Sequence, residues 1–293
     1  MKTYFILLLA LCALSSCKTK ENIQPYAAVE TYPNDTTLWR LTPQRAMIVI
    51  AHDDDMCAMT GTISLLNKKG WDIKVISLPL NPERDQVHIK ACNGILDHVE
   101  FYNLTYKQFR NDSDTNRILH RALPRQTFGV VFNKQVFETE LTKQVNEFDP
   151  SLIFTLDNDI GAYGHPDHVF ISQMVVDLAN ARIIKPRFIY QSVYTPHMIE
   201  SIMRRHSQRM ASWGFSGNEW ENSKRTYQLK ELPVPSIQIN IISEADEKMA
   251  YLKSYNERER KTMGFYIPAF EDYKAKDYFS VFDREFYRVI QLQ

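Results

Sequence analysis

The chain has 293 residues, of which 44% are hydrophobic and 12% aromatic, which excludes an intrinsically disordered protein and allows a sizeable buried core. Lysine and arginine together number 35, as do aspartate and glutamate, so the charge balance gives no reason to expect nucleic acid or a strongly anionic partner. This length fits one large domain or two small ones.

The first 17 residues have the pattern of a secretion signal. Lys2 gives a positive start, and the apolar run over residues 4–14 is too short to span a membrane as a helix. The ending Leu14-Ser15-Ser16-Cys17 resembles the signal of bacterial lipoproteins, in which the cysteine is acylated and becomes the first mature residue. We therefore expect a lipid anchor at Cys17, as the sole membrane contact, and a location in the bacterial cell envelope on the periplasmic or surface side. A plain signal peptide with an incidental cysteine is the alternative.

Residues 18–41 are polar, contain two prolines and lack periodicity, which predicts a tether between the lipid and a domain over residues 42–293. Cys57 and Cys92 remain beyond the signal of an exported chain, where a disulfide can form. We expect two buried thiols instead, because a chain of this length needs no covalent staple.

Short β-rich runs alternate with helical patterns along the rest of the chain. The predicted strands cover residues 47–51, 73–78, 99–102, 151–156, 188–193 and 237–242. The predicted helices cover residues 57–69, 83–96, 136–148, 169–181 and 244–260. This alternation predicts one α/β domain with a mostly parallel sheet and helices on both faces. Residues 201–232 are weakly patterned and fit either a loop that lines a site or ordinary surface packing.

The first chemistry-bearing motif is Ala51-His52-Asp53-Asp54-Asp55-Met56, directly after the first strand. Three consecutive carboxylates repel one another and lose hydration unless something positive is held there, and histidine with aspartate suits zinc. His52 and Asp55 are three residues apart, a spacing that a strand-to-helix turn can return to one side. Asp54 would then lie near the metal without binding it. A solvated acidic turn that caps the next helix explains this motif equally well.

The second motif is Tyr163-Gly164-His165-Pro166-Asp167-His168, after the strand predicted to end at residue 156. Ligands of such sheets bind beyond the carboxyl ends of the strands, so the two motifs should meet there. His168 would supply a third metal ligand and leave one position open for water, as in catalytic zinc sites. A helix N-terminus capped by Asp167, with two exposed histidines, is the alternative.

The two motifs together resemble the PIG-L/LmbE family of zinc-dependent N-acetylglucosaminyl deacetylases. The resemblance covers about residues 45–181, with weaker similarity near residues 248–256 and 284–288. It implies a Rossmann-like α/β fold and one zinc ion, or a similar divalent metal, per chain. By position, the resemblance also implies that His52, Asp55 and His168 bind the metal and that Asp54 is the general base. It implies that His165 faces the reacting carbonyl and that the Asp167 carboxylate orients His165. Tyr163 would lie over the substrate, and Arg84 would contact it.

Three positions depart from the family pattern. Val87 stands where the family usually has a glutamate, which makes the Arg84 match looser. Asp53 replaces a proline, and its charge should tighten metal binding or raise the pKa of Asp54. Met56 replaces a glutamate, which removes a carboxylate expected behind the ligands.

These observations predict a metal-dependent hydrolase that removes an N-acetyl group from an N-acetylglucosamine-type amino sugar or glycoconjugate, with no obligate protein partner evident. One alternative is a non-catalytic envelope lipoprotein that binds glycan through a degenerate metal site, which Asp53 and Met56 favour. Another is an amidase acting on a different N-acyl substrate, which would use the same residues.

Overall fold

The computed structural model describes residues 20–78, 82–93, 95–96, 99–103, 109–111 and 122–292. The predicted signal and its Cys17 lie outside the described residues. Within the described part of the chain, no helix has the length and apolar character needed to cross a membrane.

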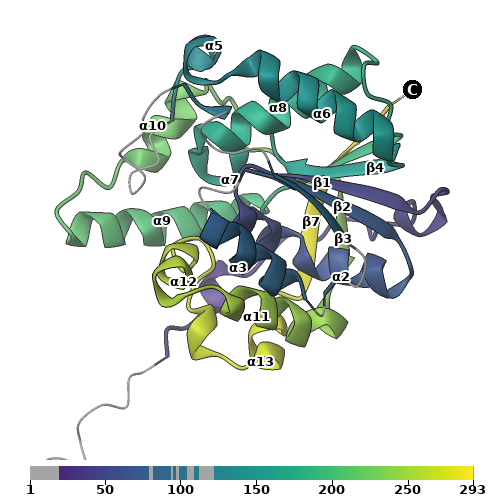
Figure 1. Ribbon diagram of the computed structural model, residues 1–293. Helices are drawn as coiled ribbons and strands as arrows, with labels where there is room; N and C mark the ends of the chain where they lie inside the picture. Colours follow the sequence, from purple (N-terminus) through teal and green to yellow (C-terminus); the bar gives the residue numbers. More distant parts are fainter. Residues whose placement is uncertain are drawn as a thin grey trace, which may run out of the picture.

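A seven-stranded sheet forms the centre of the described chain, in the order β3-β2-β1-β4-β5-β7-β6 (Figure 1). The strands are β1 Arg45–Val49, β2 Asp72–Ser77, β3 Val99–Asn103, β4 Leu152–Leu156, β5 Phe188–Ser192, β6 Ile237–Asn240 and β7 Arg284–Gln291. Strands β1 to β5 pair in parallel, and β7 is antiparallel to β5 and β6. The prediction of a mostly parallel α/β sheet is confirmed, and β7 is a strand that the sequence did not reveal.

Helices cover both faces of this sheet (Figure 1). They are α2 Thr60–Lys68, α3 Pro82–Cys92, α5 Phe128–Val131, α6 Lys134–Phe148, α7 Gly161–Gly164, α8 Pro166–Asn180, α9 Pro196–Ser212, α10 Glu219–Thr226, α11 Ala245–Ser254, α12 Glu257–Met263 and α13 Ala275–Phe279. Short 3-10 turns are η1 Gln24–Tyr26, η2 Leu38–Arg40, η3 Asp53–Ala58, η4 Arg125–Thr127, η5 Ile242–Glu244 and η6 Phe270–Asp272. Consecutive residues of β1 belong to different hydrophobic cores. Ile48 packs with Ile63 of α2, whereas Val49 packs with Val169 of α8. The strand is therefore buried on both faces, which explains its continuous apolar sequence.

One predicted helix differs from the structure, and one stretch that the sequence left open is helical. The helix expected over residues 244–260 is two helices, because the Asn256 side chain accepts a hydrogen bond from the backbone N–H of Glu259 (3.0 Å) and starts α12. Residues 201–232, whose sequence fits either a loop that lines a site or ordinary surface packing, contain most of α9 and all of α10. Both helices bury apolar side chains, among them Met203 and Trp220, against the rest of the domain.

Residues 20–41 form part of the folded domain, although the sequence predicts a tether there. Ile23 and Leu38 are buried in the core. The Asp35 carboxylate accepts a hydrogen bond of 2.7 Å from the Tyr190 hydroxyl of β5. Isolated apolar side chains, too widely spaced to form a pattern, therefore attach this segment to the domain.

Candidate metal centre

The two histidine motifs meet at the carboxyl ends of β1 and β4, which are neighbours in the sheet. His52 follows β1 and precedes η3, and its backbone N–H donates to the Asp55 carboxylate at 2.8 Å. His165 follows α7 and is the N-cap of α8, so His168 lies in the first turn of that helix. The sheet edge therefore brings together residues separated by more than one hundred positions.

The three predicted ligands converge on one point. His52 Nδ1 lies 3.0 Å from His168 Nε2, which lies 3.1 Å from Asp55 Oδ1. His52 Nδ1 is also 3.5 Å from Asp55 Oδ2. Ligand atoms of a tetrahedral zinc site with bonds of about 2.0–2.1 Å lie about 3.3 Å apart, so these separations suit such an ion.

The partners of the outer ring nitrogens indicate which nitrogens face the metal. His168 Nδ1 lies 3.0 Å from the Gly161 carbonyl oxygen, which only accepts, so Nδ1 carries the proton and Nε2 has the lone pair. His52 Nε2 lies 3.3 Å from Asp167 Oδ2, which leaves the lone pair of His52 on Nδ1. Histidines that bind metals usually donate their other N–H to a carbonyl or carboxylate in this way.

The electrostatics of the cluster favour a cation. Burial lowers the pKa of His52, but the Asp55 and Asp167 carboxylates outweigh it and hold that pKa well above its usual value. Burial raises the pKa of Asp55, but His168 and His52 outweigh it and hold this pKa well below its usual range. Positive charge is therefore stabilised between the carboxylates, where a divalent ion would bind.

His165 lies in the same cluster, since one nitrogen of each of His52, His165 and His168 falls within 4.8 Å of the others. Its Nδ1 accepts a hydrogen bond of 3.2 Å from the backbone N–H of Asp167. The neutral ring then carries its proton on Nε2, which can donate to a substrate oxygen but cannot bind a metal. This geometry supports His165 as a hydrogen-bond donor beside the metal rather than as a ligand.

The Asp167 carboxylate acts mainly on His52, although the resemblance implies that it orients His165. Its Oδ2 contacts His52 Nε2, whereas its Oδ1 lies 3.9 Å from His165 Nδ1. The same Oδ1 accepts a hydrogen bond of 2.7 Å from Arg110, and both side chains of this ion pair are buried. Arg110 is a single arginine in a stretch without a recognisable pattern, so the sequence did not predict its ion pair with Asp167.

Arg84 binds carboxylates of the protein. Its Nη2 lies 2.6 Å from Asp53 Oδ1 and 3.1 Å from Asp54 Oδ1, and its Nε lies 3.3 Å from Glu259 Oε1. Burial and then the neighbouring Asp54 raise the pKa of Asp53 to about 7, against the opposing effect of Arg84. The charge that replaces the family's proline therefore has its own counter-ion.

The three aspartates differ in exposure. The Asp54 side chain is 23% exposed, whereas those of Asp53 and Asp55 are 1% and 7% exposed. Asp54 is thus the carboxylate of the motif that is most open to a water molecule or a substrate.

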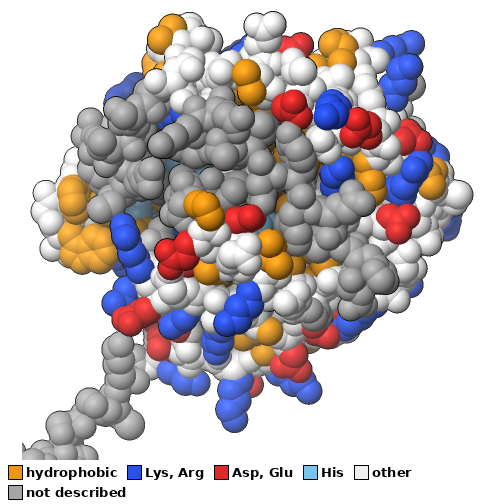
Figure 2. All heavy atoms as spheres, in the orientation of Figure 1, with side chains coloured by type: hydrophobic (Ala, Val, Ile, Leu, Met, Phe, Trp, Pro, Cys, Tyr) orange, Lys and Arg blue, Asp and Glu red, His pale blue; other side chains and the backbone are white. Residues whose placement is uncertain are grey.

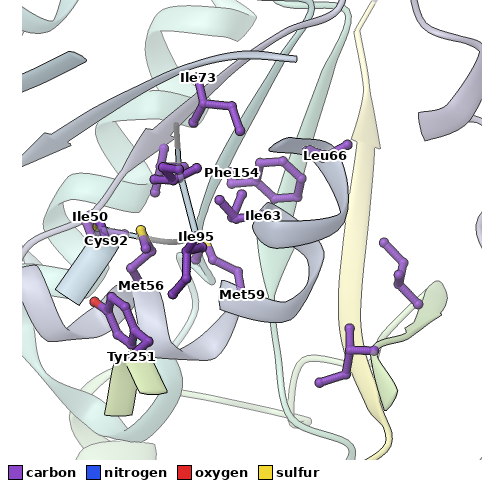
Figure 3. Packing of buried hydrophobic residues seen from close by; sticks show 14 of the residues in the cluster. Ile50, Met56, Met59, Ile63, Leu66, Ile73, Cys92, Ile95, Phe154 and Tyr251 are labelled. Atoms are coloured by element: carbon purple, nitrogen blue, oxygen red, sulfur yellow. The ribbon is translucent and has the colours of Figure 1, made fainter. Parts of the chain in front are cut away.

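Met56 packs in the core beneath η3 and not beside the ligands. Figure 3 shows its side chain among Ile50, Cys92 and Tyr251. It is fully buried there. Cys92 is likewise buried and Cys57 half-buried, and both are free thiols, as expected.

The loop between β4 and α8 is organised by Asp157, a residue that the sequence reading missed. Its carboxylate accepts hydrogen bonds from the backbone N–H groups of Ile160 (2.8 Å), Gly161 (3.2 Å) and Ala162 (2.7 Å). This arrangement fixes the Gly161 carbonyl that orients His168. An aspartate directly after a buried strand, with a glycine four residues later, was the available signal.

Tyr163 lines the same site. Its ring lies 5.1 Å from that of His168 and stacks on Tyr266 at 3.7 Å, with 13° between the planes. Burial raises the pKa of Tyr163 well above its usual value, so its hydroxyl stays protonated and can donate a hydrogen bond.

Residues 47–179 match the PIG-L family, described as GlcNAc-PI de-N-acetylase. This match covers a little under half of the chain. The matched range contains both histidine motifs. No curated protein sequence matches the chain.

Solved structures resemble this chain at low sequence identity. The 4-carboxy-2-hydroxymuconate hydratase GalB from Pseudomonas putida is 13% identical with a TM-score of 0.50, covering 85% of this chain and 97% of its own. N,N'-diacetylchitobiose deacetylase from Pyrococcus horikoshii is 14% identical with a TM-score of 0.44, covering 87% and 89%. The zinc-inhibited form of teicoplanin deacetylase is 12% identical with a TM-score of 0.49, covering 84% and 98%. The hydratase in this group shows why the reaction has to be argued from the site and not from the fold.

Proposed function

We propose that the PIG-L domain is a metal-dependent deacetylase that hydrolyses the N-acetyl group of an N-acetylglucosamine-type amino sugar or glycoconjugate. The observation that carries the proposal is the convergence of His52 Nδ1, His168 Nε2 and the Asp55 carboxylate within 3.5 Å of one another. The family description, GlcNAc-PI de-N-acetylase, supports the same reaction. Zinc bound by these residues would supply a Lewis acid that polarises an acyl carbonyl and lowers the pKa of water towards about 7.

The remaining residues have roles that follow from their chemistry. Asp54, the most exposed carboxylate of its motif, takes a proton from the attacking water, whose oxygen bonds to the acyl carbon. His165 Nε2–H and the Tyr163 hydroxyl donate hydrogen bonds to the carbonyl oxygen as it gains negative charge. The C–N bond then breaks, the amine takes the proton, and acetate and the free amino sugar leave.

These observations weaken one of the two alternatives. A degenerate, non-catalytic glycan-binding site was suggested by Asp53 and Met56, but Asp53 pairs with Arg84 and Met56 lies in the core. Neither departure removes a ligand or the proposed base. An amidase acting on another N-acyl compound would use the same residues, so a substrate panel has to separate it.

The test compares two neighbouring aspartates in the zinc-loaded protein. Asp54→Asn keeps the shape but loses basicity, so acetate release should fall about 100- to 10,000-fold while zinc content stays at one per chain. Asp55→Asn should lose both zinc and activity. N-acetylated saccharides and N-acyl amides without a sugar form the panel. Retention of zinc and full activity in both variants would refute the site.

We also propose that Cys17 is acylated and anchors the enzyme to the bacterial envelope. The proposal rests on the Leu14-Ser15-Ser16-Cys17 ending of an apolar run. Labelling of growing cells with a fatty-acid probe should modify the parent but not Cys17→Ala. An acyl-free mature protein that begins at another residue would overturn it.

A further inference from the structure

The described chain begins at Lys20, and its first residues are fixed to the domain. The Glu21 carboxylate pairs with the Arg205 guanidinium of α9 at 2.5 and 2.7 Å. The Glu21 carbonyl oxygen accepts a hydrogen bond of 2.6 Å from the Tyr273 hydroxyl. The Lys20 ammonium lies over the Tyr273 ring (4.8 Å), and Ile23 is buried in the core. The folded domain therefore includes the chain from Lys20 onward.

Only two residues separate Lys20 from Cys17, the proposed site of acylation. Three residue steps span at most about 10–11 Å even when the chain is fully extended. A domain of this length is roughly 50 Å across, by the usual scaling of size with chain length. If Cys17 carries the lipid, the surface around Lys20 is therefore held close to the bilayer, and the opposite side of the domain cannot reach it.

The surface around Lys20 is formed by η6, α13 and the end of α11. Figure 1 shows the described chain entering the domain beside these elements, on the opposite side of the sheet from α6. Tyr273, between η6 and α13, is half-buried, and the exposed Lys274 and Lys276 follow it. The exposed Lys253 of α11 donates a hydrogen bond of 3.3 Å to the Tyr273 carbonyl oxygen. We call these four lysines and Tyr273 the lysine face.

The chemistry of the lysine face suits the headgroup layer of a bilayer. Lysine ammonium groups attract anionic headgroups, and tyrosine is favoured at the interface between water and lipid. Asp272 and Asp277 are also exposed there, but the lysines outnumber them, and Glu271 is paired with Arg260 at 2.6 Å. Figure 2 shows lysine and arginine side chains along the lower edge of the molecule, where α11 and α13 lie in Figure 1. The net charge of this face is therefore positive.

We propose that the lysine face is a membrane-contact surface, and that its partner is the bilayer that carries the Cys17 anchor. The proposal rests on the acylation of Cys17 proposed above and makes it more specific, because it assigns one side of the domain to the membrane. It is independent of the reaction at the metal centre.

The anchored end of the chain and the metal centre are attached to the same turn. Arg205, which holds Glu21, also donates a hydrogen bond of 2.9 Å to the Gly264 carbonyl oxygen. Two residues later, the Tyr266 ring stacks on Tyr163 at the site. Contact through the lysine face would therefore give the metal centre a fixed orientation relative to the bilayer.

Chemical modification of lysines measures this contact. The acylated full chain is placed in vesicles of phosphatidylcholine and phosphatidylglycerol and treated with a membrane-impermeant amine-reactive reagent. The lipid-free chain from Lys18 onward is the reference. Lys274 and Lys276 should react about three- to tenfold more slowly in the vesicles, as for a face that is covered about 70–90% of the time. Lys134 and Lys143, exposed on α6, are the matched controls and should react at the reference rate.

A spacer tests the argument from the length of the chain. Insertion of about twelve glycine and serine residues between Thr19 and Lys20 gives a flexible link that reaches roughly 20 Å. The protection of Lys274 and Lys276 should then fall to less than half of its value in the parent. Protection that the spacer leaves unchanged would overturn the proposal that the short link holds this face on the bilayer.

Flotation of the vesicles and acetate release show which proposal fails. If the parent floats but all four lysines react at the reference rate, or if Lys134 and Lys143 are the protected pair, the lysine face is refuted and the anchor stands. A parent that does not float refutes the anchor and the lysine face together. Acetate release by the zinc-loaded lipid-free chain tests the deacetylase by itself, because none of these lysines belongs to the proposed site.

Discussion

The buried ion pair between Arg110 and Asp167 offers a test of how the metal centre is supported. The two side chains are 2% and 1% exposed and lie 2.7 Å apart. Arg110→Met keeps much of the apolar stem but removes the charge. Breaking a buried pair costs about 3–5 kcal/mol, and we take about 3 kcal/mol because His52 also contacts Asp167. For a large domain this corresponds to a fall in Tm of roughly 6–12 °C.

The same substitution should also weaken metal binding. Asp167 fixes the His52 ring through Nε2, and loss of such support typically lowers metal affinity about 10- to 100-fold. Thermal unfolding with and without zinc, and competition with a chelator, measure the two effects separately. Arg110→Met/Asp167→Asn should recover much of the stability, because no buried charge is then unpaired. A change in unfolding free energy below about 0.5 kcal/mol, with unchanged zinc affinity, would refute the reasoning.

Two further substitutions probe the loop and the helix that flank the site. Gly161→Ala should destabilise the protein by about 1–3 kcal/mol and lower zinc content, because φ is 59° and the new Cβ would lie 2.6 Å from His168 Cβ. Gly70→Ala is its control, with φ 78° and nothing within 4 Å, so it should show only the backbone cost and normal zinc. Burial, then Arg209 and Arg205, lower the pKa of His206 to about 4, so the folded state binds fewer protons and stability falls as the pH drops from about 6.5 towards 4. Between pH 7 and 5, the free energy of unfolding of the parent should fall by about 1 kcal/mol more than that of His206→Gln, as measured by denaturant unfolding. If the free energies of the two proteins change in parallel with pH, this prediction is contradicted.

The parts of the protein that short sequence patterns determine could be predicted. Strands β1 and β4, which the two motifs follow, are mostly apolar runs, because both faces of each strand are buried. The ligands lie in two compact motifs directly after two such strands, so placing the strands also placed the ligands.

The features that the sequence did not reveal depend on contacts between distant residues. Strand β7 contains Glu285, which looks like a surface residue. Its carboxylate can be buried because it accepts hydrogen bonds from the backbone N–H groups of Gly61 and Thr62, both at 2.8 Å, and forms an ion pair with Lys248. Arg110 supports its partner across 57 residues of chain. Neither interaction leaves a local pattern.

The site divides three consecutive, chemically identical aspartates among three environments. Asp55 faces His52 and His168, Asp53 is buried against Arg84, and Asp54 remains partly exposed. Their different surroundings, and not their side-chain chemistry, therefore separate the ligand from the base. Because Arg84 is bound to these carboxylates and to Glu259, it is a poor candidate for recognising the sugar. Recognition of the sugar then has to come from other side chains around the site, among which Tyr163 lies against His168.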